Sequence, residues 1–216
     1  DVTAADRIEV LAIHIHPDYE AVRVLHDIAL LELASDAPGT PIPWQVDPVL
    51  PVAGTSLMVS GWGAIRADGS IYDTVLRLSP AVALGGPGDS VCGSWRDYEP
   101  DSELCVGAAS GVGACSGDSG GPVVAELGMT RLVGITSYGL SGSCADTTYP
   151  NVAARVSSKA AWITSMVGSP WRETSGLQTP SHEVDGLVNG RMYTFHVTAI
   201  DAMGRSLDQM QVTAMP

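Results

Sequence analysis

The sequence predicts an all-β fold that is followed by one helix and then by a smaller β-rich segment. Two observations predict the β fold: short apolar and β-branched runs recur along the 216 residues, and 24 glycines and 14 prolines separate them. A third observation is that only one stretch has apolar residues at helical spacing. Many short strands between turn residues are typical of antiparallel sandwiches and barrels.

Six runs ahead of the helix are expected to form strands, because each is rich in apolar or β-branched residues and is bounded by turn residues. They are Arg7–Ile15, Asp27–Leu33, Leu57–Trp62, Val75–Leu84, Pro122–Leu127 and Leu132–Tyr138. A turn at Gly128, Met129 and Thr130 joins the last two runs, so we expect them to form a hairpin.

The helix is expected to begin at Ser157 or Ser158, because either side chain can cap its first turn. Gly168 and Pro170 then end it after about three turns. The apolar positions at helical spacing are Ala160, Ala161, Ile163, Met166 and Val167. A helix of this length suits the surface of a β core.

The character of the chain changes after the helix, which predicts two structured parts. Residues 1–168 are expected to form the first domain, and the polar, turn-rich residues 169–181 are expected to form a linker. In the remaining residues 182–216, the run Tyr193–Ile200 alternates apolar and polar side chains and predicts a half-buried strand.

Net charge argues against two classes of partner. The chain carries 24 acidic and 11 basic residues, which gives a net charge of −13. So acidic a surface repels phosphate groups, and we expect no binding to nucleic acid or to anionic membranes. No stretch approaches the roughly 18 apolar residues that a membrane-spanning helix needs.

Cysteine spacing bears on metal sites and on the compartment. Cys92, Cys105, Cys115 and Cys144 match no Cys-x-x-Cys pattern, so we expect no metal site. An even number of cysteines among glycine-rich loops suggests two disulfides and an oxidising compartment. Four unpaired thiols in the core of a cytosolic protein are the alternative interpretation.

The segment with the most chemical information runs from Cys115 to Pro122 and places Ser119 between glycines. Glycine permits unusual backbone angles and leaves room for a substrate to approach a hydroxyl. The amides of Gly117 and Ser119 are therefore candidates for an oxyanion hole. For Gly-Asp-Ser-Gly alone, an ordinary β-turn without catalytic function is the alternative.

The full segment, Cys-Ser-Gly-Asp-Ser-Gly-Gly-Pro, resembles the nucleophile motif of the chymotrypsin-like (trypsin family) serine proteases. The resemblance extends from Asp6 to about Val167 and implies that Ser119 is the nucleophile and Asp27 the acid of a catalytic triad. Further segments match the family in the same order: His16–Tyr19, His26–Leu31, Ser60–Gly63, Val133–Gly139 and Tyr149–Val152.

The same serine also fits Gly-x-Ser-x-Gly, the nucleophile elbow of α/β-hydrolases. That elbow needs a helix after the serine. Here Pro122–Ala125 follows and favours a strand, so we set the elbow aside.

The resemblance implies a chymotrypsin-like antiparallel double β-barrel with a C-terminal helix, in which most of the first barrel is missing. It also implies that Cys92 pairs with Cys105 and that Cys115 pairs with Cys144. A third disulfide of the family would join the positions that Leu57 and Ala125 hold here, and both cysteines are absent together.

The catalytic histidine is the missing part. The family carries it in an Ala-Ala-His-Cys segment well before the aspartate, and no such segment occurs here. His26 neighbours Asp27, but alternation along a strand is expected to turn the two side chains to opposite faces. The other histidines are His14 and His16, to which we assign structural roles, and His182 and His196, which lie beyond the protease-like region. We therefore expect this chain to lack the general base and to be inactive.

The resemblance places Gly113 at the base of the pocket that receives the side chain before the cleaved bond. Because Gly113 carries no charge, we expect cleavage after uncharged residues. The other positions that the resemblance assigns to the pocket are Ala114 beside the base, Ser137, Tyr138 and Gly139 as a wall, and Asn151, which is expected to project inward.

Near the C-terminus, Leu187 and Tyr193 flank Asn189-Gly190 in an arrangement that resembles the tyrosine corner of a fibronectin type III module. The segment is too short for the ~100-residue sandwich of such a module, so we expect a partial one. An ordinary β-hairpin extension is the alternative.

Together these features imply a secreted serine endopeptidase that works through an acyl-enzyme and uses no cofactor. Its partners are expected to be polypeptide substrates or protein inhibitors, and the chain is expected to be a monomer. A non-catalytic serine protease homologue that acts as a binding module is the alternative. Asp27, Ser119 and Gly117 argue against that alternative, because binding alone requires no nucleophile.

Overall fold

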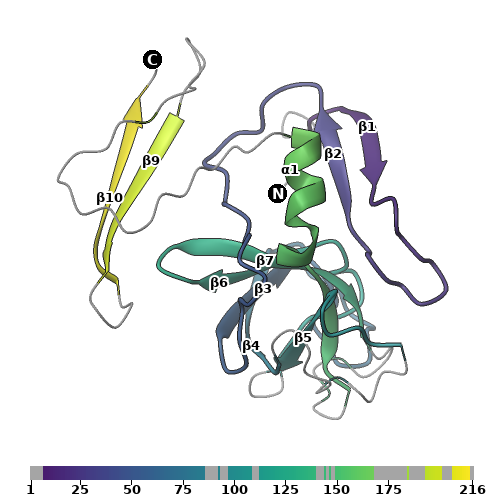
Figure 1. The fold of residues 1–216 in the computed structure, drawn as a ribbon. Coiled ribbons are helices and arrows are strands. Elements are labelled where there is room, and N and C mark those ends of the chain that lie inside the picture. The colour runs from purple at the N-terminus through teal and green to yellow at the C-terminus, as the bar shows by residue number, and fades with distance from the viewer. Residues whose placement is uncertain are drawn as a thin grey trace. The chain divides into compact units, whose positions relative to one another are not determined.

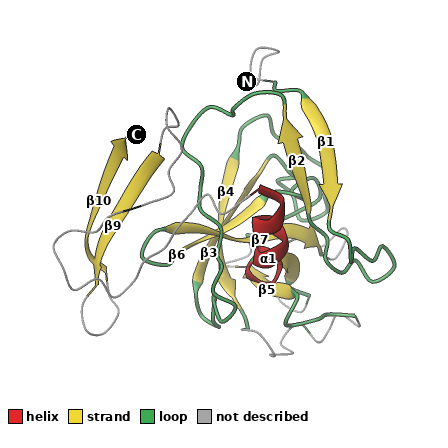
Figure 2. Cartoon of the chain, turned by 45° about the horizontal axis from the view of Figure 1, so that its top comes forward, coloured by secondary structure: helices red, strands yellow, loops and turns green. Residues whose placement is uncertain are grey.

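The computed structural model describes residues 7–85, 92, 97–108, 112–139, 144, 146, 149–167, 184, 193–200 and 206–214. The chain forms two compact units, Asp1–Ser169 and Pro170–Pro216 (Figure 1). Strands predominate in both units, and the single α-helix of the described residues lies in the first (Figure 2). No described helix combines the length and the apolar character that crossing a membrane requires.

Six antiparallel strands of the first unit close into a barrel in the order β3-β4-β5-β8-β7-β6. The strands are β3 (Ser56–Gly61), β4 (Arg77–Ala83), β5 (Glu103–Ala108), β6 (Pro122–Glu126), β7 (Thr130–Tyr138) and β8 (Asn151–Arg155). In β3 the buried Leu57 and Val59 alternate with the exposed Ser56 and Met58. This alternation fills the barrel interior, where Leu57 and Val59 pack in one cluster with the fully buried Leu104.

The two positions where the family has a third disulfide lie opposite each other. Leu57 on β3 pairs with Ala125 on β6, and both side chains are buried in the barrel core. The apolar pair thus occupies the space between these strands without a covalent link.

The remaining strands of the first unit, β1 (Val10–Ile15) and β2 (Ala29–Leu33), form a separate antiparallel sheet. On one face, Leu30 packs against the cluster of Ile28 and Ile163 that joins this sheet to the barrel. The other face is apolar and exposed, with side chains of Val10, Leu11, Ile13, Ile15, Leu31 and Leu33. The described residues therefore hold one complete barrel and two strands beside it, and the predicted all-β fold with its helix is confirmed.

The helix begins later than predicted, and its predicted cap is wrong. A 3₁₀ turn, η2 (Ser157–Lys159), precedes α1 (Ala160–Val167), and Val156 ahead of it already has helical backbone angles without a side-chain cap. Ser157 Oγ donates instead to the carbonyl of Leu50, and Ser158 Oγ donates to the carbonyl of Arg155. A cap needs a residue in extended conformation, which neither serine provides here.

Two barrel strands, β5 and β8, were not predicted. Both are almost entirely buried, and each carries a buried charged residue, Glu103 in β5 and Arg155 in β8. Arg155 Nε donates to the carbonyl of Glu103 at 3.1 Å. A strand that is buried on both faces lacks the alternation by which exposed strands are identified in a sequence.

The second unit contains an antiparallel pair, β9 (Tyr193–Ile200) and β10 (Ser206–Ala214). The predicted strand Tyr193–Ile200 is confirmed, and β10, whose bounds were not predicted, pairs with it as in a β-hairpin. The expected linker, residues 169–181, and Leu187 with Asn189-Gly190 lie outside the described residues.

Burial in the barrel predicts a contrast between two leucines. Leu104 on β5 is fully buried and Leu78 on β4 is 67% exposed. We expect Leu104→Ala to lower the free energy of unfolding by about 2–5 kcal/mol, because it leaves a cavity. The matched change Leu78→Ala should cost less than about 0.5 kcal/mol. Urea unfolding of both variants tests this, and equal losses would contradict the barrel core described here.

Candidate active site

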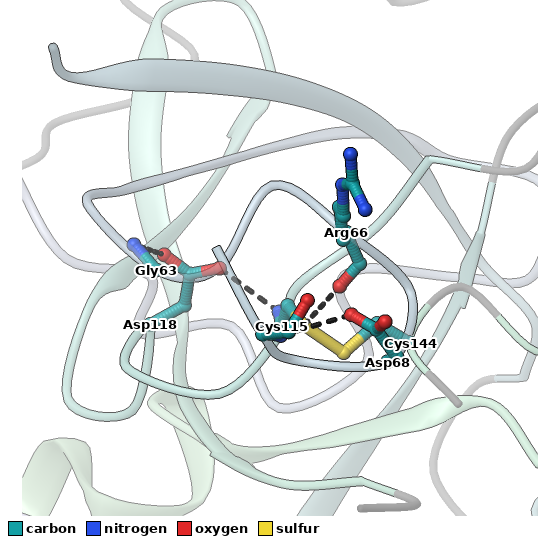
Figure 3. Close-up of a disulfide and its surroundings, with 7 residues drawn as sticks. Gly63, Arg66, Asp68, Cys115, Asp118 and Cys144 are labelled. Carbon is teal, nitrogen blue, oxygen red and sulfur yellow. Dashed lines mark hydrogen bonds between the residues drawn. A yellow bond between two sulfur atoms is a disulfide. The ribbon is translucent and has the colours of Figure 1, made fainter. Parts of the chain in front are cut away.

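The carboxylate of Asp118 holds the turn that carries Ser119. Its Oδ1 accepts a hydrogen bond from the amide of Gly63 at 2.8 Å, and its Oδ2 accepts one from the amide of Cys115 at 2.9 Å. Figure 3 shows the carboxylate between these two amides. Asp118 thereby ties the turn of Ser119 to the Gly61-Trp62-Gly63 turn at the end of β3.

This contact explains why the Gly-Trp-Gly turn needs its glycines. A Cβ at Gly61 would lie 2.0 Å from Asp118 Oδ1, and a Cβ at Gly63 would lie 2.4 Å from Asp118 Cγ. Such distances are far inside van der Waals contact. Neither position therefore accepts a side chain while Asp118 keeps its place.

The backbone around Ser119 presents two amides that have no acceptor among the described residues. Within the described chain, neither the amide of Gly117 nor that of Ser119 donates to a protein acceptor, whereas the amide of Gly120 donates to Thr136. Gly117 has φ = 93°, a left-handed conformation that glycine adopts readily. Gly117 and Ser119 are both exposed. Free donors beside an exposed hydroxyl are what an oxyanion requires.

Ser137, on β7, connects the expected nucleophile with the expected acid. Its hydroxyl donates to Asp27 Oδ2 at 2.6 Å, and its carbonyl accepts a hydrogen bond from Ser119 Oγ at 3.4 Å. Asp27 is half-buried and Ser119 is exposed. The structure thus brings together two residues that are far apart in the sequence.

None of the histidines whose side chains the structure describes contacts Ser119. His14 lies 3.4 Å from Glu32, and the rings of His16 and His26 stack on each other. His26 and Asp27 do have different partners, but strand alternation is not the reason. Both residues precede β2, and His26 has a positive φ of 52°. His182 lies outside the described residues, as does the side chain of His196.

The predicted pocket residues fall into two groups. Gly113 and Ala114 line a cavity of about 400 Å³ that also borders Asp118. The other four predicted residues are absent from the described lining of this cavity, namely Ser137, Tyr138, Gly139 and Asn151. In the second group, Gly139 and Asn151 lie against each other. A Cβ on Gly139 would lie 2.3 Å from Asn151 Nδ2, so the Asn151 amide fills the space over Gly139.

Tyr138 is half-buried, and its ring packs against the cluster of Cys92, Cys105 and Val152. Burial, together with the negative charge of Glu103, raises the pKa of Tyr138 and keeps its hydroxyl protonated. Its side chain therefore belongs to the core, and only its backbone can form part of a substrate-binding wall.

Both disulfides have the pairing that the resemblance implies, Cys92–Cys105 and Cys115–Cys144. Cys92 and Cys105 are fully buried. The second disulfide borders the cavity beside Gly113, next to Arg66 (Figure 3). Over the described ranges, no group of three or more His, Cys, Asp or Glu side chains is placed to hold a metal ion.

Sequence analysis missed a buried polar cluster at the start of the helix. Lys159, the only lysine of the chain, is 2% exposed. Its Nζ donates to Ser102 Oγ at 2.7 Å and to Ser158 Oγ at 2.8 Å. Burial lowers the pKa of Lys159 to about 8, although the nearby carboxyl of Glu103 acts in the opposite direction. No motif marks these residues, because a lysine is ordinarily a surface residue.

Comparisons with known proteins concern the first unit. The family model named Trypsin matches residues 2–163. Trypsin of Xenopus laevis is 33% identical over 162 residues, which are 71% of this chain and 62% of that protein. The inactive CLIP domain-containing serine protease A3 of Aedes aegypti is 33% identical over 164 residues, which are 71% of this chain and 34% of that protein. The chain thus spans less than two thirds of the length of these relatives.

A solved structure has the same fold. Neuropsin, a serine protease expressed in the limbic system of mouse brain, matches with a TM-score of 0.63 and 25% sequence identity. The match covers 74% of this chain and 71% of that chain.

The contact between Asp118 and the Gly-Trp-Gly turn predicts energetic coupling. We expect Gly63→Ala to destabilise the protein by about 1–3 kcal/mol, because its Cβ collides with the carboxylate. In the Asp118→Ala background the same change should cost less, with a coupling energy of roughly 0.5–3 kcal/mol. Gly107→Ala is the matched control, since a Cβ there collides with Leu84 and not with Asp118, so its cost should be the same in both backgrounds. Urea unfolding measures all variants, and strictly additive losses would contradict the contact.

Proposed function

Because this chain belongs to the trypsin family of serine proteases, we propose that it carries the chemistry of a serine endopeptidase, with Ser119 as nucleophile and Asp27 as triad acid. One observation carries the proposal. Ser137 donates to Asp27 at 2.6 Å, and its carbonyl accepts a hydrogen bond from Ser119 Oγ at 3.4 Å. A single residue of β7 thereby joins two of the three groups that a triad needs.

In the proposed reaction, Ser119 Oγ attacks the peptide carbonyl while a histidine takes its proton. The same histidine returns the proton to the leaving amine as the C–N bond breaks, and water then hydrolyses the acyl-enzyme. The amides of Gly117 and Ser119 stabilise the oxyanion, each by roughly 3 kcal/mol. Asp27 orients the histidine and stabilises its charged form.

We place that histidine outside these 216 residues. His14, His16 and His26 have other partners, and a serine hydroxyl without a base is a weak nucleophile. When a triad member is lost, the oxyanion hole and binding leave only about 10³–10⁴-fold catalysis over water. The chain alone is therefore proposed to be inactive, and the activity belongs to a protein that supplies the base.

The proposed substrates are polypeptides with an uncharged residue before the scissile bond. Gly113, at the expected pocket base, offers no carboxylate to a basic side chain. The Asn151 amide that covers Gly139 is likewise uncharged. A protein inhibitor with an uncharged residue in this position would dock in the same way.

The proposed setting is extracellular, because both disulfides need an oxidising compartment to persist. We propose a monomer in which residues 1–168 are the protease domain, 169–181 the linker and 182–216 a partial fibronectin type III-like segment. The β9–β10 pair and the separate compact unit from Pro170 support this division.

A second candidate is a non-catalytic serine protease homologue that binds proteins. The observation in its favour is that no histidine in the described part of the chain contacts Ser119. In addition, one relative is named an inactive serine protease.

Labelling by a fluorophosphonate probe tests the proposal. We expect the chain alone to show no labelling above that of Ser119→Ala. Free imidazole at high concentration supplies the missing base and should produce labelling at Ser119. Ser116→Ala removes an exposed serine of the same turn and should leave the imidazole-dependent labelling unchanged.

Three outcomes would contradict parts of this proposal. Stoichiometric labelling without imidazole, lost in Ser119→Ala, would show that a residue of this chain is the base. Absence of labelling, both with imidazole and in a longer chain that carries an upstream histidine, would favour the binding module. In an active form, a peptide panel that showed preference for arginine or lysine would contradict the pocket assignment.

A further inference from the structure

Two imidazoles stack where the segment 16–28 meets the barrel and the helix. The ring centroids of His16 and His26 lie 5.0 Å apart with an interplanar angle of 9°, and the ring of Trp162 meets His16 edge-on at 4.8 Å. His16 is 8% exposed. Parallel imidazoles at this distance are compatible when neutral, but two positive charges there repel each other strongly.

A buried ammonium lies behind this stack. Lys159 Nζ donates to Ser102 Oγ at 2.7 Å, and the same Oγ lies 3.3 Å from His26 Nδ1. Ser102 thus connects the helix start and β5 to the histidine pair. A proton added to His26 would place a second positive charge one hydroxyl away from Lys159.

The segment that the stack holds has a strained backbone. Val24 and His26 have φ values of 58° and 52°, which are unfavourable for residues with a Cβ and especially for a β-branched one. Glu20 and Leu25 pair across the turn through two backbone hydrogen bonds. Contacts outside the turn must therefore keep His26 in place. Its ring has two such contacts in the described structure, the stack on His16 and the contact with Ser102 Oγ.

Charges from every neighbouring element act on the pair. Burial lowers the pKa of His16 and of His26, and the charge of Lys159 lowers both further. Carboxylates act in the opposite direction, namely Asp18 on both rings and Glu20 and Glu99 on His26. Glu103 and Arg155 face Lys159, and Arg23 pairs with Glu99.

We propose that the stacked pair His16–His26 is an acid-sensitive latch: through the contacts of His16 with Trp162 and of His26 with Ser102 it holds the segment 16–28, and with it Asp27, against the barrel at neutral pH and releases it in acid. The release separates Asp27 from Ser137, so it disconnects the expected acid from the site. The latch itself is a structural device and does not depend on the proposed peptidase chemistry.

The direction of the pH dependence follows from the lowered pKa values. Well above pH 6.5, the ordinary histidine pKa, both histidines are neutral in the closed and open states, and the latch contributes its full stability. As the pH falls below 6.5, the open state takes up protons first, and the closed state loses stability. Burial raises the pKa of Glu103, so protonation of that carboxyl favours the closed state and opposes the histidines.

The test follows the intact 216-residue chain from pH 7.5 to pH 5. Ring NMR signals report the two titrations, and hydrogen exchange reports the protection of backbone amides after correction for intrinsic rates. We expect both rings to titrate below pH 6.5. Protection at the hydrogen-bonded amides of Tyr19, Leu25 and Ile28 should fall about tenfold for each unit by which closure lowers a histidine pKa. The amides of strands β3 to β8 should keep their protection.

The double variant His16→Phe/His26→Phe keeps an aromatic stack that takes up no proton, and its protection should not change with pH. His14→Gln is the matched control, because this histidine lies on β1 beside Glu32 and outside the latch. It should retain the acid response. The proposal is overturned if either ring of the unchanged chain titrates at or above pH 6.5, if segment 16–28 stays protected in acid, or if the double variant still opens.

Discussion

The geometry of the site depends on one residue of the barrel, Ser137. Its hydroxyl donates to Asp27 and its carbonyl accepts from Ser119, so the position of β7 decides where both groups lie. The strand is itself fixed by pairing with β6 and β8 on its two sides. The amide of Gly120 donates to the carbonyl of Thr136, and the amide of Thr136 donates to the carbonyl of Gly121, which places the turn of Ser119 against the same strand. The closed barrel therefore positions Ser119 through β7.

The position of Asp27 depends on other contacts. Asp27 lies at the end of a segment that the barrel does not include, and the sheet β1–β2 that follows exposes one apolar face. What joins this segment to the barrel is a small apolar cluster around Ile28 and Ile163, together with the polar cluster around Lys159. Polar contacts of this kind stabilise only while every group has its partner and its ordinary charge. Asp27 is therefore held less firmly than Ser119.

Sequence reasoning identified the features that local patterns determine. The runs that became β3, β4, β6 and β7 have their apolar residues at strand spacing, and the eight residues from Cys115 to Pro122 carry a specific motif. It failed where tertiary contacts decide. Glu103, Arg155 and Lys159 belong to residue types that are ordinarily exposed, yet all three are buried. Ser157 and Ser158 read as caps, yet the backbone before them is already helical. Nothing in a single sequence shows that Ser137 would reach both Asp27 and Ser119.

The burial of charge has a consequence for the whole molecule. The chain has a net charge of −13, yet its only lysine lies in the interior together with one of its arginines. Buried cations do not offset repulsion between surface carboxylates as surface cations do, because their charges are distant from that surface. They instead make the junction between segment 16–28 and the barrel sensitive to proton uptake. The junction that carries Asp27 is thus the part of the first unit where a change of pH acts most directly. The disulfides, and the hydrogen bonds that the Asp118 carboxylate accepts from backbone amides, keep the turn of Ser119 in place.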